Sequence, residues 1–267
     1  MKFSEPIILG RTGLKACRLG VASGYGAPAP AMEEAFERGC NYFVWGSFIL
    51  GRSAKMRDAI CHIIQKGQRE KLILAMLSYA HQPFLTEYFF MKGLKEAGTN
   101  YADILVLGSF SKPPSQKIIE GALKMKEKGI CRFIGLTGHN RKLFPELRKQ
   151  NVIDLFHIRY NAVHRGAETE TFPFLQGENR PGVVTFTATS WGQLLNAKKM
   201  PPGESPPTAI DCYRFVLSNP AIDLCLTAPK TIEQMRQNLA VLDLEPMNSE
   251  ELERMRRIGD HIHKKKG

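Results

Sequence analysis

Polar side chains that could transfer a proton come directly after short apolar runs of this sequence. Tyr79 follows the run at 71–77, and His139 follows the run at 131–137 after one glycine. A histidine titrates near neutral pH without help, whereas an exposed tyrosine needs its pKa of about 10 to be lowered before it can act as an acid. Tyr79 and His139 are therefore our candidates for catalytic proton transfer.

A denser polar cluster accompanies the apolar run at 155–160. It contains Arg159, Asn161 and Arg165. Arginine presents its N–H donors as a planar fork that can bind a carboxylate or phosphate with two parallel hydrogen bonds. The 267 residues carry a formal net charge of +11, which also favours an anionic ligand. We predict that these three residues bind a small-molecule substrate with a negative charge.

Composition argues against several other kinds of site and partner. The six cysteines are widely spaced and form no CxxC pair, so we predict buried reduced thiols and no metal site. Aromatic and basic residues are not interleaved as in RNA-binding proteins, so we expect no nucleic-acid partner. No apolar run reaches the ~18 residues of a membrane span, and the N-terminus lacks a secretory signal. We therefore expect a cytoplasmic protein with no membrane partner, and make no prediction of its oligomeric state.

These polar residues must be positioned by an alternation of apolar runs and helical segments. Eight short runs rich in branched residues are typical of buried strands. They lie at 18–23, 41–45, 71–77, 102–107, 131–137, 155–160, 183–187 and 222–227. Segments of helical period separate them, such as the apolar stripe of Met56, Ala59, Ile60 and Ile63. The chain has close to the roughly 250 residues of one (β/α)8 barrel, and we predict that fold for a single domain over 1–267.

Helix-capping patterns and one irregular stretch complete the outline. Thr231 is placed to cap a helix over 232–242. Asn248 and Glu251 approximate a capping box for a last helix outside the eightfold repeat. The longest irregular stretch, 196–207, follows the seventh predicted strand, where the loops of a barrel form its functional face. A functional loop and a plain surface loop both remain open interpretations of it.

Short motifs over nearly the whole chain resemble those of the aldo-keto reductase family, in the same order. They lie at 10–20, 39–43, 51–53, 101–105, 128–137 and 228–238. The first resembles that family's opening hairpin and first strand, and the last its nucleotide-binding segment. The resemblance implies a (β/α)8 TIM barrel with an N-terminal β-hairpin, to which the predicted last helix adds an extra C-terminal helix.

The resemblance also exposes a departure. Members of the family are typically NADP-dependent carbonyl reductases, which use a tetrad of Asp, Tyr, Lys and His. The matching places of this sequence hold Val44, Ile49, Leu77 and Gly108, and a slip of one residue would put Phe48 in place of Ile49. Catalysis by the standard tetrad is therefore not expected.

The family's nucleotide-binding places are better matched. Lys230 and Thr231 stand where family members bind the 2′-phosphate of NADP, and a lysine suits a phosphate as a point charge. Gln234 and Asn238 match the places that hold the adenine end.

Three further residues match the family's nicotinamide end. Phe186 stands where an aromatic side chain stacks on the nicotinamide ring, and Thr137 and His157 stand where polar groups hold its carboxamide. We predict that NADP is the cofactor.

Three functions remain open on this evidence. The first is an NADP-dependent oxidoreductase with non-standard acid and base residues, acting on a small carbonyl or imine. The second is a catalytically inactive homologue that serves as a nucleotide sensor or an interaction scaffold. The third is a lyase or isomerase acting on an anionic metabolite. The barrel fold alone does not decide among them, because it supports many chemistries.

Overall fold

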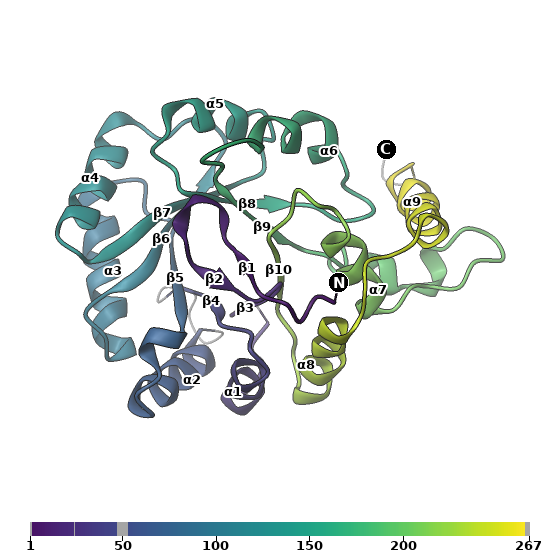
Figure 1. Ribbon diagram of the computed structural model, residues 1–267, viewed down its shortest axis with the longest axis horizontal. Helices are drawn as coiled ribbons and strands as arrows, with labels where there is room; N and C mark the ends of the chain where they lie inside the picture. The colour runs from purple at the N-terminus through teal and green to yellow at the C-terminus, as the bar shows by residue number, and fades with distance from the viewer. Residues whose placement is uncertain (1, 24, 47–52, 265–267) are drawn as a thin grey trace.

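A closed barrel of eight parallel strands, ringed by helices, forms the body of the computed structural model, which describes residues 2–23, 25–46 and 53–264 (Figure 1). The strands follow one another around the barrel in chain order, and the last pairs with the first. They are β3 (Leu19–Ala22), β4 (Tyr42–Trp45), β5 (Ile73–Ser78), β6 (Ala102–Phe110), β7 (Cys131–Gly138), β8 (Leu155–Arg159), β9 (Gly182–Phe186) and β10 (Leu224–Thr227). All eight predicted strands are confirmed, and the largest difference is β6, which runs three residues beyond its predicted end at 107.

Helices fill the intervals between strands and cover the outside of the barrel. They are α1 (Ala29–Glu37), α2 (Ala54–Gln65), α3 (Pro83–Ala97), α4 (Gln116–Glu127), α5 (Leu143–Gln150), α6 (Ala167–Glu170), α7 (Ala209–Leu217), α8 (Ile232–Leu239) and α9 (Ser249–Lys264). Short 3-10 segments add η1 (Gly10–Thr12), η2 (Arg69–Lys71), η3 (Phe172–Leu175), η4 (Gln193–Leu195), η5 (Ala197–Lys199) and η6 (Ala240–Asp243). None of these described helices is long and apolar enough to cross a membrane.

The predicted helix signals agree with the structure. Met56, Ala59, Ile60 and Ile63 form the buried face of α2. The side chain of Thr231 caps α8, where its Oγ1 accepts a hydrogen bond from the backbone N–H of the third helical residue at 3.2 Å. This helix is shorter than predicted, because the chain tightens into η6 after residue 239.

The extra C-terminal helix α9 begins with the predicted capping box. The backbone N–H of Asn248 donates to Glu251 at 2.8 Å, and the backbone N–H of Glu251 donates to Asn248 Oδ1 at 2.9 Å. The irregular stretch 196–207 contacts this helix, because Arg254 of α9 donates hydrogen bonds to Glu204 and to the carbonyl of Ser205. Part of this stretch is therefore held against α9.

A two-stranded hairpin covers the N-terminal end of the barrel. It consists of β1 (Ile7–Ile8) and β2 (Lys15–Ala16), and it crosses the centre of the ring of strands in Figure 1. Leu9 and Leu14 from the hairpin are buried in the same apolar cluster as the inward-facing strand residues. Because the hairpin occupies this end, the opposite end, where the strands finish, is left for a site.

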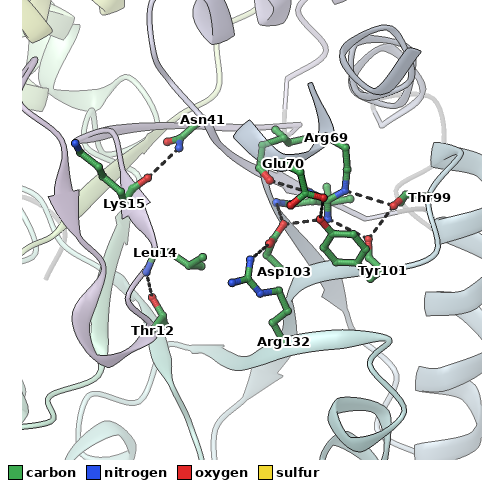
Figure 2. Close-up of polar contacts among 12 residues, drawn as sticks. Thr12, Leu14, Lys15, Asn41, Arg69, Glu70, Thr99, Tyr101, Asp103 and Arg132 are labelled. Carbon is green, nitrogen blue, oxygen red and sulfur yellow. Dashed lines mark hydrogen bonds and ion pairs between the residues drawn. The ribbon is translucent and has the colours of Figure 1, made fainter. Parts of the chain in front are cut away.

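A buried carboxylate ties two strands together near the hairpin. Asp103 on β6 accepts hydrogen bonds from Arg69 at 3.0 Å and from Arg132 at 2.9 Å, and Figure 2 shows both guanidinium groups turned toward it. The same carboxylate accepts the backbone N–H of Leu74 on β5 at 2.9 Å. This arrangement satisfies a charge that would otherwise be costly to bury.

Asp154 and Asp223 make the same kind of contact between β7 and β8 and between β9 and β10. Asp154 accepts the backbone N–H of Ile134 on β7 at 2.9 Å and pairs with Arg11. Asp223 accepts the backbone N–H of Val183 on β9 at 2.8 Å and pairs with Arg180. The N-terminal end of the barrel is thus held by ion pairs, as expected of the end that serves stability.

The predicted state of the cysteines is confirmed in the main. All six carry free thiols; five are buried, and Cys61 is half-buried. Among residues 2–23, 25–46 and 53–264, no group of three or more His, Cys, Asp and Glu side chains is placed to hold a metal ion.

Candidate functional site

A pocket of about 390 Å³ opens at the C-terminal end of the barrel. Its lining includes both candidates for proton transfer, Tyr79 and His139, and the three residues assigned to a nicotinamide ring. Those three are Thr137, His157 and Phe186. The strand ends thus bring together side chains that are far apart in the sequence, as the barrel topology requires.

Two of the four residues that the resemblance puts at the tetrad places line this pocket, and both are apolar. Val44 on β4 and Leu77 on β5 line it, joined by Leu226 on β10. Ile49 lies outside the described residues. These side chains form part of the barrel's interior cluster, so they offer a substrate dispersion contacts and no proton.

Gly108, the fourth of these places, lies beneath Tyr79. A Cβ added to Gly108 would fall 2.6 Å from Cδ1 of Tyr79 and 2.9 Å from the carbonyl oxygen of Ser78. The Tyr79 ring therefore occupies the space that a side chain at position 108 would need. Burial raises the pKa of Tyr79, so its phenol is a weaker acid than a free tyrosine.

This packing predicts that Gly108→Ala destabilises the fold by about 1–3 kcal/mol, the usual range for overpacking. In the double variant Gly108→Ala/Tyr79→Ala the ring is gone, so the combined loss should be smaller than the sum of the two single losses. Urea unfolding of the four proteins measures both quantities. Strictly additive losses would show that the two residues do not compete for the same space.

His157 forms a buried polar pair with a tyrosine inside the barrel. Its Nε2 lies 2.8 Å from the hydroxyl of Tyr42, and both residues are buried. Burial lowers the pKa of His157 to about 3 and raises that of Tyr42 well above its usual value. The pair is neutral near pH 7 and forms a polar spot in a largely apolar floor.

His139 and Phe186 stand together at the rim of the pocket. Their rings meet edge to face, with centroids 5.9 Å apart. Burial, followed by the positive charge of Arg159, lowers the pKa of His139. The neutral imidazole is therefore favoured near pH 7, and it can accept a proton more readily than donate one.

A second pocket of about 340 Å³ adjoins the first on the side of α7 and α8. Lys230, Gln234 and Asn238, three of the residues predicted to bind a nucleotide, line it. Tyr25 and Trp191 line both pockets, so the two spaces meet at these rings. We call the first space the barrel mouth and the second the α8 groove.

The four residues predicted to bind the adenine end and 2′-phosphate of a nucleotide differ in how freely they can meet a ligand, and one of them, Thr231, does not line the α8 groove. Lys230 is exposed, and its ammonium lies 5.9 Å from the centre of the Tyr25 ring. Gln234 Oε1 accepts the backbone N–H of Lys230 at 2.9 Å, while Thr231 caps the helix. Asn238 is buried and donates to Thr227 Oγ1 at 2.9 Å. Gln234, Thr231 and Asn238 thus fix the segment that carries the lysine.

The predicted anion-binding cluster does not assemble at one surface. Arg159 lies at the end of β8, half-buried, with its guanidinium 6.0 Å from the centre of the Trp191 ring. Asn161 is fully buried, and its amide donates to the carbonyl of Thr187 at 2.8 Å. Arg165 pairs with Asp260 of α9 at 2.8 Å. The latter two residues hold the turn after β8, because their polar groups are already used inside the fold.

Trp191 is a site residue that sequence reasoning missed. It is half exposed, and it lies in a short segment after β9 that holds three residues other than glycine in the left-handed region: Thr187 (φ 63°), Ser190 (φ 51°) and Trp191 (φ 54°). Each such conformation costs on the order of 1–3 kcal/mol, and this kind of strain concentrates at binding and catalytic sites. The pattern Ser190-Trp191-Gly192 was the available signal, but it does not show which way the indole points.

Comparisons with known proteins agree with this architecture. No family model matches the chain. A curated relative, the uncharacterized oxidoreductase YqkF of Bacillus subtilis, is 22% identical over 189 residues, which is 60% of this chain and 61% of the relative. The holo form of aldo-keto reductase AKR11C1 from Bacillus halodurans is 19% identical, with a TM-score of 0.79 over 95% of this chain and 96% of that one. The apo form is 21% identical, with a TM-score of 0.77 over 95% of each chain. The chain has the aldo-keto reductase fold.

Within that aldo-keto reductase fold, the barrel mouth offers hydrophobic contact and neutral hydrogen-bonding groups, and the guanidinium of Arg159 lies near it, beside Trp191. Tyr79 and His139 have pKa values displaced in the directions that disfavour proton donation at neutral pH. The site can therefore bind and orient a ligand, but it presents no strong acid among its described residues.

Proposed function

We propose that this chain binds NADP(H) across the barrel mouth and the α8 groove and acts as an oxidoreductase on a small carbonyl or imine. The observation that carries the proposal is the meeting of the two pockets at Tyr25 and Trp191. One pocket holds an aromatic ring and neutral polar groups, and the other an exposed lysine beside a helix N-terminus. Such a pair suits a ligand with a flat ring at one end and phosphates at the other.

The residues present fit the two ends of the nucleotide. Phe186 offers a face to the nicotinamide ring, and Thr137 and His157 offer hydrogen bonds to its carboxamide. Lys230 would bind the 2′-phosphate as a point charge, with the Thr231 hydroxyl beside it. When bound in reduced form, the nicotinamide supplies a hydride.

The apolar floor favours a substrate that needs little help from an acid. Reduction of a ketone leaves an alkoxide that must take a proton, whereas a cationic iminium carbon accepts a hydride and becomes a neutral amine directly. Val44 and Leu77 can pack against such a substrate, and Tyr79 and His139 can orient it by hydrogen bonds. We therefore place imines ahead of ketones in the substrate class.

The same apolar floor supports a second candidate, a protein that binds the nucleotide without turning it over. Val44 and Leu77 are buried or half-buried parts of the barrel's apolar interior. A sensor or scaffold would keep the α8 groove and lose the acid. Nucleotide binding without oxidation of NADPH by any carbonyl or imine would favour it.

We expect NADPH to bind with micromolar affinity and Lys230→Ala to weaken it by about 10- to 100-fold. This range corresponds to the ~1.5–3 kcal/mol of a hydrogen bond to a charged group. NADH lacks the 2′-phosphate, so its affinity should barely change in the variant. Titration calorimetry of both nucleotides with both proteins measures the four constants.

Lys95→Ala provides a matched control, because Lys95 is an exposed lysine on α3 and lines neither pocket. It should leave both affinities unchanged. If the wild-type chain binds neither nucleotide, the proposed function is wrong. If Lys230→Ala and Lys95→Ala behave alike, the nucleotide binds without Lys230.

A further inference from the structure

Arg159 differs from three arginines at the opposite end of the barrel in having no carboxylate partner among the described residues. Arg11, Arg69 and Arg180 each pair with a buried aspartate at 2.6–3.1 Å. Among the residues that the structure describes, none places a carboxylate within ion-pair distance of Arg159, although its side chain is half-buried. A partly desolvated charge is costly to leave unpaired, so this guanidinium is suited to an anion from outside the chain.

The groups around Arg159 reinforce its positive charge. Arg141 is near enough to lower the pKa of Arg159, an effect second to that of burial. The neighbouring carboxylate of Glu170 is already engaged by Arg141 at 2.8 Å. His139 also lies within the field of Arg159. The rim of the barrel mouth is therefore positive on the side of β7 and β8.

The guanidinium has an aromatic neighbour that lies in a strained segment of backbone. Its ring neighbour, Trp191, has a φ of 54°, and the adjacent Ser190 has a φ of 51°. The Oγ of Ser190 is buried and has no hydrogen-bond partner among the described atoms. This strained backbone positions Trp191 next to Arg159, whose guanidinium lies 6.0 Å from the centre of the indole ring.

We propose that Arg159 binds the carboxylate of the substrate, so that the substrates of this chain are small organic acids with an aliphatic body. The expectation that this acid also carries a reducible group rests on the proposed function, whereas the expectation that Arg159 binds its carboxylate does not. The aliphatic body would pack on Val44, Leu77 and Leu226 in the floor of the barrel mouth. Arg159 can grip both carboxylate oxygens with its planar fork.

The oxyanion could instead be the diphosphate of the nucleotide, which has the same chemistry. Two observations favour the substrate. His139 and Phe186 line the barrel mouth and not the α8 groove, and both lie beside Arg159: Phe186 is its register partner on β9. Arg159 lines neither space itself, but it stands at the edge of the barrel mouth, next to the half of the site in which a substrate would meet the nicotinamide ring.

The test uses 2-oxopentanoate and its neutral amide, which share one carbon skeleton and differ in charge. Each is titrated by calorimetry into the nucleotide-free chain and into the chain with NADPH. We expect Arg159→Met to weaken binding of the carboxylate by about 10- to 100-fold and to leave binding of the amide unchanged. Arg159→Lys keeps the charge but loses the planar fork, so its affinity for the carboxylate should lie between those of the wild type and Arg159→Met. Arg148→Met, on α5, is the matched control and should behave as wild type.

Tryptophan fluorescence tests whether the carboxylate binds near Trp191. The sequence has two tryptophans, of which Trp45 is buried and Trp191 is 50% exposed at the site. The carboxylate should change the emission of the wild-type chain and not that of Trp191→Phe.

Each alternative gives its own result. Equal affinity for acid and amide, or an unchanged carboxylate affinity in Arg159→Met, would overturn the proposal. So would a loss of NADPH affinity in Arg159→Met together with no carboxylate binding by the nucleotide-free chain, because the anion would then be the diphosphate. Carboxylate binding that depends on Arg159 in a chain that never binds NADPH would support this inference while the proposed function fails.

Discussion

Lowering the pH from 7 to 4 is expected to reduce the free energy of unfolding by about 3 kcal/mol through His157 alone. Burial in the folded chain lowers the pKa of this histidine from 6.5 to about 3. Between these values the unfolded chain binds a proton that the folded chain does not. Stability therefore falls as the pH drops below 6.5, by about 1.4 kcal/mol for each pH unit, and the loss levels off near pH 3.

His157→Gln isolates this effect from the titration of other groups. Glutamine does not titrate, and its amide can still bond with the Tyr42 hydroxyl, which lies 2.8 Å from His157 Nε2. We expect the variant to lose stability less steeply than the wild type over pH 6.5 to 4 in urea unfolding. Parallel pH profiles for the two proteins would mean that His157 gains its proton in the folded chain as easily as in the unfolded one.

The same substitution bears on the proposed function, in which His157 would form a hydrogen bond with the nicotinamide carboxamide. The neutral His157 is held by Tyr42 from inside the barrel, so it reaches the pocket as a fixed polar group and not as an acid. A pH dependence of nucleotide binding below neutrality should therefore come from His139, which is exposed, and not from His157.

The fold could be predicted because it depends on features that act locally. Runs such as 102–107 and 131–137 are mostly apolar, which suits strands buried on both faces. Thr231 and Asn248 cap helices by hydrogen bonds that span three residues, so sequence spacing alone specifies them. Once eight parallel strands close into a barrel, residues that follow the strands must meet at one end, which is why Tyr79 and His139 line the same pocket.

The parts of the site that could not be predicted depend on direction and on competition between partners. Asn161 and Arg165 follow Arg159 closely in the sequence, yet the turn after β8 points the first into the fold and the second toward α9. The vacancy at Gly108 is filled by a ring from the neighbouring strand, which no local pattern encodes. The position of Trp191 depends on a left-handed backbone that a non-glycine residue seldom adopts.

The two ends of the barrel handle charge in opposite ways. At the N-terminal end, each buried aspartate is paired with an arginine and with a backbone N–H of the preceding strand. At the C-terminal end, Arg159 is left without a carboxylate among the described residues. A charge that is fully paired stabilises the chain, and a charge that is left unpaired is available to a ligand. This contrast is the physical basis for assigning stability to one end and binding to the other.

The paired end yields the second large prediction. Asp103→Asn should reduce the free energy of unfolding by about 3–5 kcal/mol, because removing one partner leaves a buried charge uncompensated. The guanidinium left buried without its carboxylate is that of Arg69, whose side chain is only 11% exposed. Arg132 is half exposed and can turn to solvent. Asparagine keeps an oxygen for the backbone N–H of Leu74, so the loss reports the charge. The midpoint and slope of urea unfolding measure it.

Two further proteins make the result specific to burial. Asp243→Asn removes a partner from the exposed pair of Arg38 and Asp243, and it should cost less than about 1 kcal/mol. The double variant Arg69→Met/Asp103→Asn removes both buried charges. Its loss in the free energy of unfolding should therefore be smaller than the sum of the losses in the two single variants. If Asp103→Asn costs no more than Asp243→Asn, the ion pairs beneath the hairpin do not hold the barrel together, and its stability comes from the apolar interior alone.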